Sequence, residues 1–328
     1  TVDRVLHNRP NVSAKVRERV EKALKEQNYK PNGYASALAF NKSYHFSMLL
    51  PKHEQVAYCE EIEQGARMSA ETRRVFGVSL SILYYDRFDD ASFLEQAEIC
   101  IKEKPDGVVI VPVELDVTRQ ITEKLHELNI PFILLDSYLP DLKPLSFFGQ
   151  DSFSSGRFAA RMLMLLASQE TEVALMKITR NGRVVSKQQS NREVGFRHYM
   201  QDHFPAVKIV DLELPFNGTR QQYDDMLEKF FIDHPNIHHC ITLGSKAHVM
   251  GDYLLRANRR ATQIMGYDMV KKNAECMRLG SVSFLIAQHA YQQGYGCIDA
   301  LFKAIALKTK IQPVNYMPIE LLTQENVD

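Results

Sequence analysis

Two kinds of hydrophobic spacing divide the chain. Near the N-terminus, apolar residues recur at helical spacing in two stretches, Val2, Val5 and Leu6 in the first and Val16, Val20, Ala23 and Leu24 in the second. Pro10 interrupts them because proline lacks the N–H that a helix needs, and Ser13 suits the N-cap of a second helix over Ala14–Asn28. From Phe46 onward, short apolar runs alternate with longer amphipathic stretches. The pattern therefore predicts two N-terminal helices followed by an α/β body.

The body is predicted to consist of repeated strand–helix units. The expected strands are Phe46–Leu50, Val78–Tyr84, Gly107–Val111, Phe132–Leu135, Glu172–Lys177, Lys208–Leu214, His239–Leu243, Gln263–Gly266, Ser283–Ala287 and Tyr316–Leu321. The expected helices are Glu60–Thr72, Ala91–Lys102, Val117–Leu128, Phe153–Ala167, Asn191–His203, Arg220–His234, Ala247–Arg256 and Tyr291–Ala306. Such repeats favour parallel, doubly wound sheets covered on both faces, and the second run, which starts near Asp151, predicts two lobes.

Composition excludes several classes of protein. The 328 residues suffice for two or three domains, and 45% hydrophobic with 24% charged residues exclude a disordered chain. No apolar run approaches the ~18 residues of a membrane-spanning helix. The five cysteines are widely spaced and lack a Cys-x-x-Cys pair, so we expect free thiols without a disulfide framework or a zinc site. The absence of phosphate-binding loops, nucleophile elbows and paired metal ligands predicts a chain without catalytic activity, metal or cofactor.

The formal net charge of zero conceals a segregation of charge. Residues 1–45 hold nine Lys or Arg and four Asp or Glu, so this segment carries +5, and residues 46–328, with 31 and 36, carry −5. A small basic module on a mildly acidic body is the pattern of a nucleic-acid-binding arm. A solvated, charge-rich helix would have the same charge, so the charge alone leaves both interpretations open.

The N-terminal module resembles the headpiece of the LacI/GalR family of transcription regulators. The residues that carry the resemblance are Thr1–Ser13, Tyr29–Asn32 and Ala35–Ala39. The resemblance implies a partial, all-α helix-turn-helix headpiece with a hinge helix over residues 1–45. It also implies that the first helix of the motif is missing, so that the chain begins inside the recognition helix.

The same resemblance implies a set of DNA-binding residues. They are Thr1, Val2, Asp3, Arg4, His7, Asn11, Ser13, Lys15, Arg17 and Leu38. Arg4 would either donate to a guanine edge in the major groove or bind phosphate, and Asp3 departs from the small hydroxylic residue often found at its position. Leu38 would either wedge into the minor groove from the hinge helix or pack on the body as a linker residue.

The body resembles the two-lobed, sugar-binding body of the same family, which has the periplasmic-binding-protein-like (type I) architecture. Landmarks of the resemblance are Gly65, Asn129–Asp136, Arg192–Phe196, Met265–Asp268, Gln288 and Gln293–Tyr295. The implied lobes interleave: residues 46–149 plus 285–310 form the N-terminal lobe, and residues 150–284 plus 311–328 form the C-terminal lobe. Three crossings of the chain would then form a hinge.

Ligands of open α/β sheets bind beyond the carboxyl ends of the strands. Asp136, Arg192, Asp268 and Gln288 match the ligand-contacting positions of the family, and their side chains can bind hydroxyl and ring oxygens of a sugar. Each of these four side chains, taken alone, is as suited to capping a loop as to binding a ligand. Ser245 and Lys246 stand where the family often has Asn-Asp, so Lys246 either favours an anionic ligand or points to solvent. Tyr58 and Tyr138 would either stack on a sugar or pack in the core.

The resemblance implies a cytoplasmic transcription regulator that binds a pseudo-palindromic operator as a homodimer. A small carbohydrate (a monosaccharide, sugar acid or polyol) would bind between the lobes and change the operator affinity, as a repressor or in the opposite sense. The rival hypothesis is a periplasmic-type sugar-binding protein serving transport, whose body would look the same. Residues 1–45 discriminate between the two, because a transport protein has no use for a basic DNA-binding module.

Overall fold

The computed structural model describes residues 1–6, 10–27, 42–54, 57–180, 182–184 and 186–326. The chain divides into two compact units, residues 1–42 and 43–328, so the first ends three residues before the boundary predicted at residue 45. In the first unit, α1 (Val2–Leu6) contacts α2 (Ala14–Glu26). Ser13 is the N-cap of α2 with an extended backbone, as predicted, but its side chain makes no capping hydrogen bond. His7 and Leu38 lie outside the described residues.

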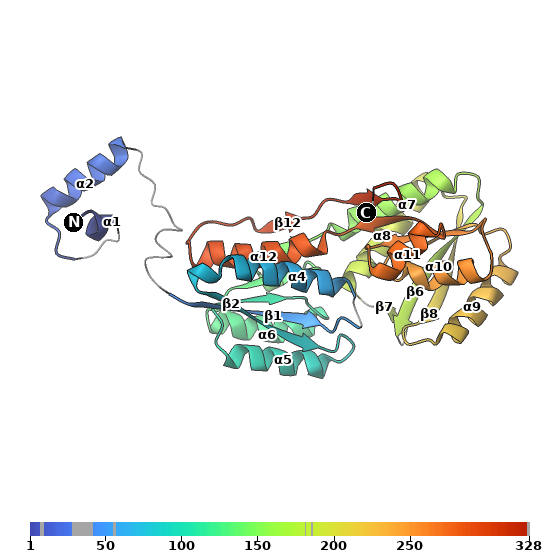
Figure 1. Ribbon diagram of the computed structural model, residues 1–328, viewed down its shortest axis with the longest axis horizontal. Coiled ribbons are helices and arrows are strands. Elements are labelled where there is room, and N and C mark those ends of the chain that lie inside the picture. Colours follow the sequence, from blue (N-terminus) through green and yellow to red (C-terminus); the bar gives the residue numbers. More distant parts are fainter. Residues whose placement is uncertain (7–9, 28–41, 55–56, 181, 185, 327–328) are drawn as a thin grey trace. The chain divides into compact units, whose positions relative to one another are not determined.

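The first lobe of the body is built on a six-stranded sheet in which each neighbouring pair is parallel (Figure 1). In spatial order its strands are β12 (Val314–Tyr316), β5 (Ser146–Gly149), β4 (Phe132–Leu135), β3 (Gly107–Ile110), β1 (Tyr44–Pro51) and β2 (Val78–Tyr85). Its helices are α4 (Tyr58–Thr72), η1 (Arg74–Phe76), α5 (Asp90–Lys102), α6 (Leu115–Glu127), η2 (Pro140–Leu142) and α12 (Ala290–Ile305).

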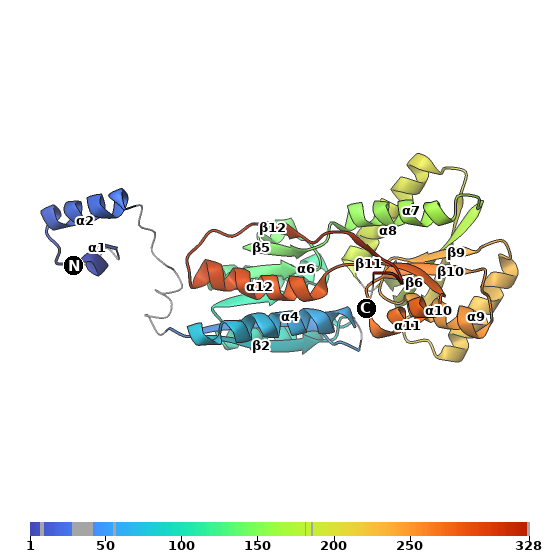
Figure 2. The same ribbon diagram turned by 45° about the horizontal axis from the view of Figure 1, so that its top comes forward.

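Alternating side chains on the central strands bury both faces of this sheet. Phe46 and Met48 of β1 pack in the cluster that α4 and α12 cover, whereas Leu49 belongs to the cluster beneath α5 and α6. Figure 2 shows α4 and α12 running side by side. Because neighbouring strand residues point to opposite faces, a strand covered on both sides is mostly apolar, as β1 is from Met48 to Leu50, although Ser47 is also buried.

The second lobe contains a seven-stranded sheet of mostly parallel strands. Its order is β13 (Glu320–Leu322), β11 (Val282–Ala287), β10 (Gln263–Tyr267), β9 (His239–Thr242), β6 (Glu172–Arg180) and β7 (Arg183–Val184), and β8 (Lys208–Pro215) also pairs with β6. Its helices are α7 (Ser152–Leu166), α8 (Lys187–His203), α9 (Arg220–Asp233), α10 (Ala247–Arg256) and α11 (Lys271–Arg278). The strands β7 and β13 pair antiparallel at the two ends of the order.

The predicted fold class, two doubly wound α/β lobes behind a helical headpiece segment, is confirmed, with local exceptions. The single strand expected over Tyr316–Leu321 is wrong: β12 pairs with β5 in the first sheet, and β13 pairs with β11 in the second. The chain therefore crosses between the lobes after residue 316, so residues 314–316 lie in the first sheet and not in the second lobe. The strand β5 and the helix α11 were not predicted, because both are short and polar where they begin.

Each lobe contains one very close helix crossing that is made possible by a reciprocal pair of glycines. A Cβ atom on Gly65 of α4 would lie 2.0 Å from the carbonyl oxygen of Tyr291, and one on Gly294 of α12 would lie 1.9 Å from that of Ile62. In the second lobe, a Cβ atom on Gly156 of α7 would lie 2.0 Å from the carbonyl oxygen of Arg192, and one on Gly195 of α8 would lie 2.1 Å from that of Phe153. Only glycine permits the two helix backbones to approach this closely. The crossing of α7 and α8 therefore fixes the position of α8 in the second lobe.

A buried glutamine joins the three crossings between the lobes. Gln150 lies on the first crossing, and its amide nitrogen donates to the carbonyl oxygens of Ala287 and Pro318, both at 3.0 Å, on the other two. Its amide oxygen accepts from the hydroxyl of Ser155 at 2.7 Å, and that hydroxyl lies 2.9 Å from the hydroxyl of Tyr267. The hinge is therefore bonded directly to α7 and, through the Ser155 hydroxyl, to the end of β10.

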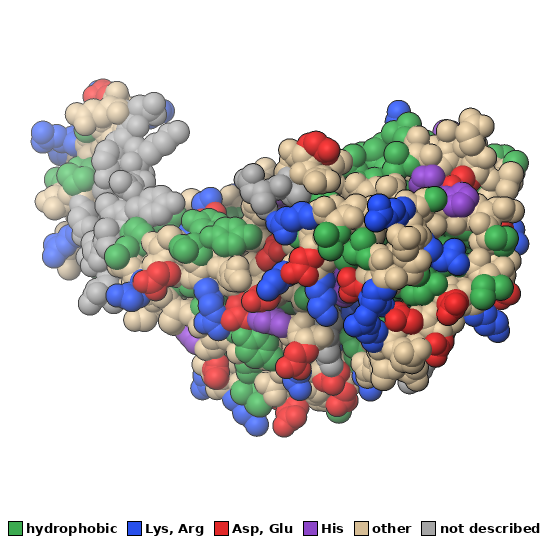
Figure 3. All heavy atoms as spheres, turned by 45° about the vertical axis from the view of Figure 1, so that its right-hand side comes forward, with side chains coloured by type: hydrophobic (Ala, Val, Ile, Leu, Met, Phe, Trp, Pro, Cys, Tyr) green, Lys and Arg blue, Asp and Glu red, His purple; other side chains and the backbone are tan. Residues whose placement is uncertain are grey.

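The surface of the body has mixed charge. On the face drawn in Figure 3, Lys and Arg side chains are interspersed with Asp and Glu across the body. The −5 of the body is therefore not gathered into one acidic patch on this face. No helix among the described residues combines the length and the apolar character that a membrane-spanning helix requires.

Candidate functional site

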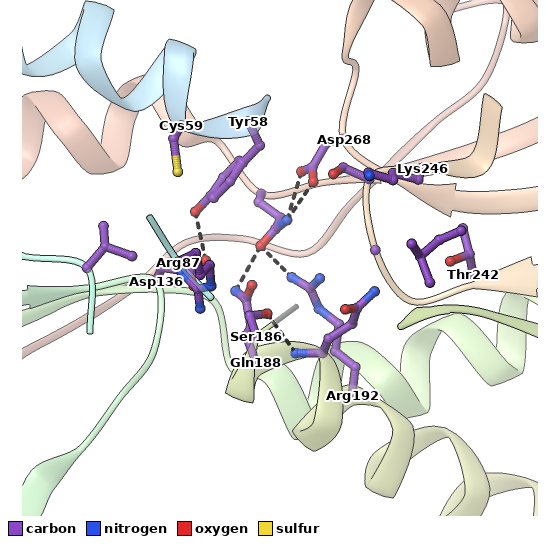
Figure 4. Close-up of a pocket in the computed structure, with 16 residues that line it drawn as sticks. Tyr58, Cys59, Arg87, Asp136, Ser186, Gln188, Arg192, Thr242, Lys246 and Asp268 are labelled. Carbon is purple, nitrogen blue, oxygen red and sulfur yellow. Dashed lines mark hydrogen bonds between the residues drawn. The ribbon is translucent and has the colours of Figure 1, made fainter. Parts of the chain in front are cut away.

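A cleft with about 620 Å³ of space, part of it open to solvent, lies at the carboxyl ends of the strands of both sheets (Figure 4). The first lobe lines it with Tyr58, Cys59, Arg87, Val111 and Asp136. The second lobe lines it with Ile178, Ser186, Gln188, Gln189, Arg192, Thr242, Gly244, Ser245, Lys246, Asp268 and Gln288. This is where open α/β sheets bind ligands, because loops at the strand ends leave a crevice there.

Two aspartates occupy equivalent places in the two sheets. Asp136 follows β4 with φ 72°, and Asp268 follows β10 with φ 65°. The backbone N–H of each donates to a carbonyl oxygen of the next strand, Phe148 for Asp136 at 2.9 Å and Ile286 for Asp268 at 3.1 Å. Aspartate tolerates this left-handed conformation better than most residues, and the conformation turns each buried carboxylate toward the cleft (Figure 4).

The second lobe supplies a hydrogen-bonded network around Arg192. Its guanidinium donates to the carbonyl oxygen of Leu243 at 3.1 Å and to the side-chain oxygen of Gln288, and lies 3.9 Å from the centre of the Tyr267 ring. The Gln288 amide nitrogen donates to both carboxylate oxygens of Asp268 at 2.8 Å, and Gln188 donates to the Gln288 oxygen at 2.8 Å. These contacts hold the side chains in one arrangement before any ligand enters.

Burial dominates the protonation of Asp268. Loss of water around its carboxyl raises the pKa from the ordinary 3.8 to about 7, although Arg192 and the hydrogen bonds from Gln288 act in the opposite direction. The carboxylates of Glu61 and Asp136 add to the rise. A carboxyl of this kind is poised between its two charge states near neutral pH, and a ligand hydroxyl that donates to it would favour the ionised form.

Tyr58 and Asp136 are joined by a hydrogen bond on the first-lobe wall. The Tyr58 hydroxyl donates to Asp136 Oδ1 at 3.1 Å and lies 3.3 Å from Gln293 Oε1. Burial, followed by the nearby Asp136 carboxylate, raises the pKa of Tyr58 well above its ordinary value, so its hydroxyl remains a donor. Ser137 also donates to Asp136, at 3.2 Å.

The loop between β9 and α10 brings Ser245 and Lys246 to the cleft. It is held by the buried Asn273, whose amide nitrogen lies within 3.0 Å of the carbonyl oxygens of Ser245, Tyr267 and Asp268. The amide oxygen of Asn273 accepts from the backbone N–H of His248 at 2.9 Å. Asn273 therefore ties the strand end that carries Asp268 to the loop that carries Lys246.

Several buried polar atoms at the cleft lack a hydrogen-bond partner within the described part of the chain. They are Gln189 Oε1, Arg192 Nε and Thr242 Oγ1. An unsatisfied buried polar atom is costly, and a polar ligand in the cleft would supply the missing partners. This pattern favours a ligand rich in hydroxyl or other polar groups.

The structure places most of the predicted ligand residues together. Asp136, Arg192, Asp268, Gln288, Ser245, Lys246 and Tyr58 all line the cleft. Tyr138 does not: its ring packs 4.7 Å from that of Phe147, and the side chain is partly exposed. Arg192 lies in the second turn of α8, because the helix begins at Lys187, four residues before the predicted start.

Sequence reasoning missed several lining residues. Gln188 and Gln189 lie in the first turn of α8, and the Ser186 hydroxyl accepts from the Gln189 N–H at 3.2 Å as the helix cap. Arg87 follows β2, and Thr242 ends β9. Their positions just beyond strands, or at a helix N-terminus that faces the cleft, were the available signal.

The described DNA-binding candidates lie on the surface of the headpiece unit. Thr1, Val2, Arg4, Asn11, Ser13 and Lys15 are exposed, and Arg17 is half-buried. Arg4 lies in the last turn of α1, and Val5 beside it is buried. The side chain of Asp3, with His7 and Leu38, is outside what the structure describes.

Two family models match the chain, one for each unit. The model described as bacterial regulatory proteins, lacI family, matches residues 1–32, and the model of the periplasmic binding protein domain matches residues 46–309. The second match covers most of the body, including both walls of the cleft.

Individual proteins agree with these matches. A solved structure from Bacteroides fragilis, assigned as a LacI transcriptional regulator, is 41% identical and has a TM-score of 0.83, covering 87% of this chain and 98% of that one. The ribose operon repressor of Lactococcus lactis is 22% identical over 99% of this chain and 94% of its own length. The sucrose operon repressor of Staphylococcus xylosus is 26% identical, but the match spans only 43% of this chain and 42% of that protein.

Proposed function

The chain belongs to the LacI family of bacterial regulatory proteins, and from this premise we propose that it is a transcription regulator whose operator affinity responds to a small carbohydrate in the cleft. One observation carries the proposal. A DNA-binding segment of this family precedes a body whose cleft unites two carboxylates, a buried arginine and several amides.

The chemistry of the cleft supports a polyhydroxylated ligand. Carboxylates accept from sugar hydroxyls, and Arg192 and the amides of Gln188 and Gln288 donate to hydroxyl or ring oxygens. Three relatives that span most of this chain, from Lactococcus lactis, Escherichia coli and Shigella flexneri, are named for a ribose operon. The ligand is proposed to bind one arrangement of the lobes more tightly than the other, which is the condition for coupling to DNA.

The headpiece is proposed to bind DNA through both kinds of contact. Arg4, exposed on α1, would read a base edge or bind phosphate, and Lys15 and Arg17 of α2 would bind phosphate. A homodimer would place two headpieces on the half-sites of a pseudo-palindrome. The body of a transport protein would have the same cleft, but the match of residues 1–32 favours the regulator.

The test measures binding of the full-length protein to fluorescent DNA from upstream of its own gene, with increasing salt and with a carbohydrate library. We expect binding that falls steeply with salt, because phosphate contacts release counterions, and that changes with at least one carbohydrate. Arg4→Ala should weaken specific binding, whereas Glu127→Ala, an exposed change in the body, serves as the matched control. Salt-independent binding, or equal binding to unrelated DNA, would contradict the proposal.

A further inference from the structure

We propose that the effector carries an anionic group, a carboxylate or a phosphate, on its polyhydroxylated body, and that Lys246 binds this group. The inference rests on the proposed function, because it names the chemical class of the ligand for the same cleft. It follows from the charges lining the cleft, from the surroundings of Lys246 and from the unsatisfied groups beside it.

The charges that line the cleft favour a negative ligand. The cations are Arg87, Arg192 and Lys246, and the carboxylates are Asp136 and Asp268. Burial raises the pKa of Asp268 to about 7, so its negative charge is incomplete near neutral pH. Arg192 is joined to Asp268 through Gln288, so a neutral sugar would leave the Lys246 ammonium without a carboxylate partner among the described residues of a partly buried site.

Lys246 is the cation with the clearest need for an anion. Its side chain is half-buried at the cleft, and its ammonium lies 3.7 Å from the centre of the Phe216 ring. Within the part of the chain that the structure describes, Lys246 makes no ion pair with a carboxylate. Burial, and then the neighbouring positive charge of Lys272, lowers the pKa of Lys246 to about 8. An anionic group in the cleft would counteract both effects on the pKa by supplying an opposite charge.

The aromatic surroundings hold Lys246 in place. The Phe216 ring beneath its ammonium contacts the Phe88 ring of the first lobe, with centroids 4.6 Å apart. The Arg180 guanidinium lies 4.8 Å from the centre of the Phe88 ring. The two lobes thus meet through aromatic side chains next to the cation, and these side chains reduce its access to water, which strengthens its attraction for an anion.

Two further features near Lys246 favour the same anion. Lys246 is the N-cap of the ten-residue helix α10, whose N-terminal end carries a partial positive charge, although the His248 N–H in its first turn already donates to Asn273. Thr242, fully buried on the preceding strand, lines the same cleft, and its hydroxyl lacks a partner among the described residues. A hydroxyl, an ammonium and a helix N-terminus together suit oxygens that share a negative charge.

The experiment compares matched neutral and anionic ligands by calorimetric titration of the full-length protein. The pairs are galactose with galacturonate, glucose with glucuronate, and each sugar with its 6-phosphate. We expect at least one anionic member to bind about tenfold or more tightly than its neutral partner, the usual advantage of a charged hydrogen bond. Comparison of the uronate and phosphate arms identifies which anion the site takes.

Two substitutions assign the preference to Lys246. Lys246→Met keeps the length of the side chain and should bring the affinity ratio of the anionic to the neutral ligand close to one, while Lys246→Arg should retain most of it. Lys272→Met, which removes an exposed charge from α11 nearby, should change the ratio much less. Circular dichroism verifies that each variant is folded.

The outcomes separate this inference from the proposed function. Tighter binding of the neutral ligands, or an unchanged ratio in Lys246→Met, would overturn the anionic class but leave a carbohydrate-responsive regulator intact. Binding of neither class would overturn the inference, and it would also remove the support for a carbohydrate effector. Salt-dependent binding to DNA is measured separately and tests the regulator by itself.

Discussion

The two walls of the cleft are built on one plan but carry different chemistry. In each lobe a strand ends in an aspartate of positive φ, Asp136 or Asp268, and a glycine-mediated helix crossing lies behind it. On the first wall, Asp136 accepts from Tyr58 and Ser137. On the second wall, Asp268 belongs to a network with Gln288 and Arg192. The same backbone device therefore supports two different electrostatic environments.

The difference suggests a division of labour between the lobes. The second wall is held in one geometry by its own hydrogen bonds, and preorganised polar groups bind a ligand with little further ordering. The first wall offers fewer polar groups. It belongs to the lobe on the other side of the hinge, whose three crossings are joined by Gln150. We expect the second lobe to provide most of the binding energy and the first lobe to complete the site on closure.

The largest effect is expected where the helix crossing of the second lobe is broken. Gly156→Ala gains up to about 1 kcal/mol of helix propensity, but its Cβ would stand 2.0 Å from the carbonyl oxygen of Arg192. Overpacking typically costs about 1–3 kcal/mol and occasionally more, and a clash this close to a backbone carbonyl belongs at the upper end, so the clash decides the sign. Denaturant unfolding measures the loss of stability. Val194→Ala is the control, because Val194 lies on α8, the helix that Gly156 contacts, and its side chain is 58% exposed.

The first-lobe counterpart sharpens the comparison. Gly65→Ala creates the same clash against the Tyr291 carbonyl and should cost a similar free energy of unfolding. It does not displace Arg192, so a folded Gly65→Ala protein should retain more ligand affinity than a folded Gly156→Ala protein. Equal losses of affinity would contradict the division between the walls.

The next largest effect is expected from Arg192→Met. It removes the donor to Gln288 and the positive charge beside Asp268, and ligand affinity should fall about 100-fold, which corresponds to roughly 2.7 kcal/mol. The pKa of Asp268 should rise further, because the largest influence that lowers it is gone. Calorimetry gives the affinity and a carboxyl-resolved NMR titration gives the pKa. A lower pKa in the variant would refute this account of the network.

Asp268 should make stability depend on pH. Its folded pKa of about 7 lies above the ordinary 3.8, so the folded state holds a proton that the unfolded state has released between these values. The free energy of unfolding should therefore fall as pH rises from about 4 to 7, by at most ~1.4 kcal/mol per pH unit, and this contribution should level off above pH 7. Asp268→Asn should remove the slope, and Asp225→Asn, exposed on α9, should retain it. Urea unfolding across this range decides the matter.

The smallest effect is expected on the first wall. Tyr58→Phe removes only the hydroxyl that donates to Asp136, and it preserves the buried ring. The loss of one hydrogen bond should weaken ligand binding by about 1 kcal/mol, several-fold in affinity. Calorimetry beside the Arg192→Met titration makes the comparison direct. A loss as large as that of Arg192→Met would show that the first wall contributes as much as the second.

Prediction from the sequence succeeded where local patterns are strong. The apolar runs and their spacing predicted the α/β body, and the residues after strands pointed to Asp136 and Asp268. The prediction failed for β12 and β13. The chain passes from one sheet to the other within a few residues, and such a passage leaves no periodic pattern in the sequence. Tyr138 was a ligand candidate by its residue type alone, with packing as the alternative, and its ring packs on Phe147.

The sequence by itself determined the family, the α/β order of elements and the residue types available for a polar ligand, because these follow from spacing and from motifs along the chain. Only the tertiary structure decided which of these residues face one another. In the folded protein, Gln150 joins the crossings of the hinge and Asn273 holds the loop that carries Lys246. Burial in the same structure raises the pKa of Asp268. Burial and hydrogen-bond geometry depend on contacts between segments far apart in the chain, and no local pattern encodes them.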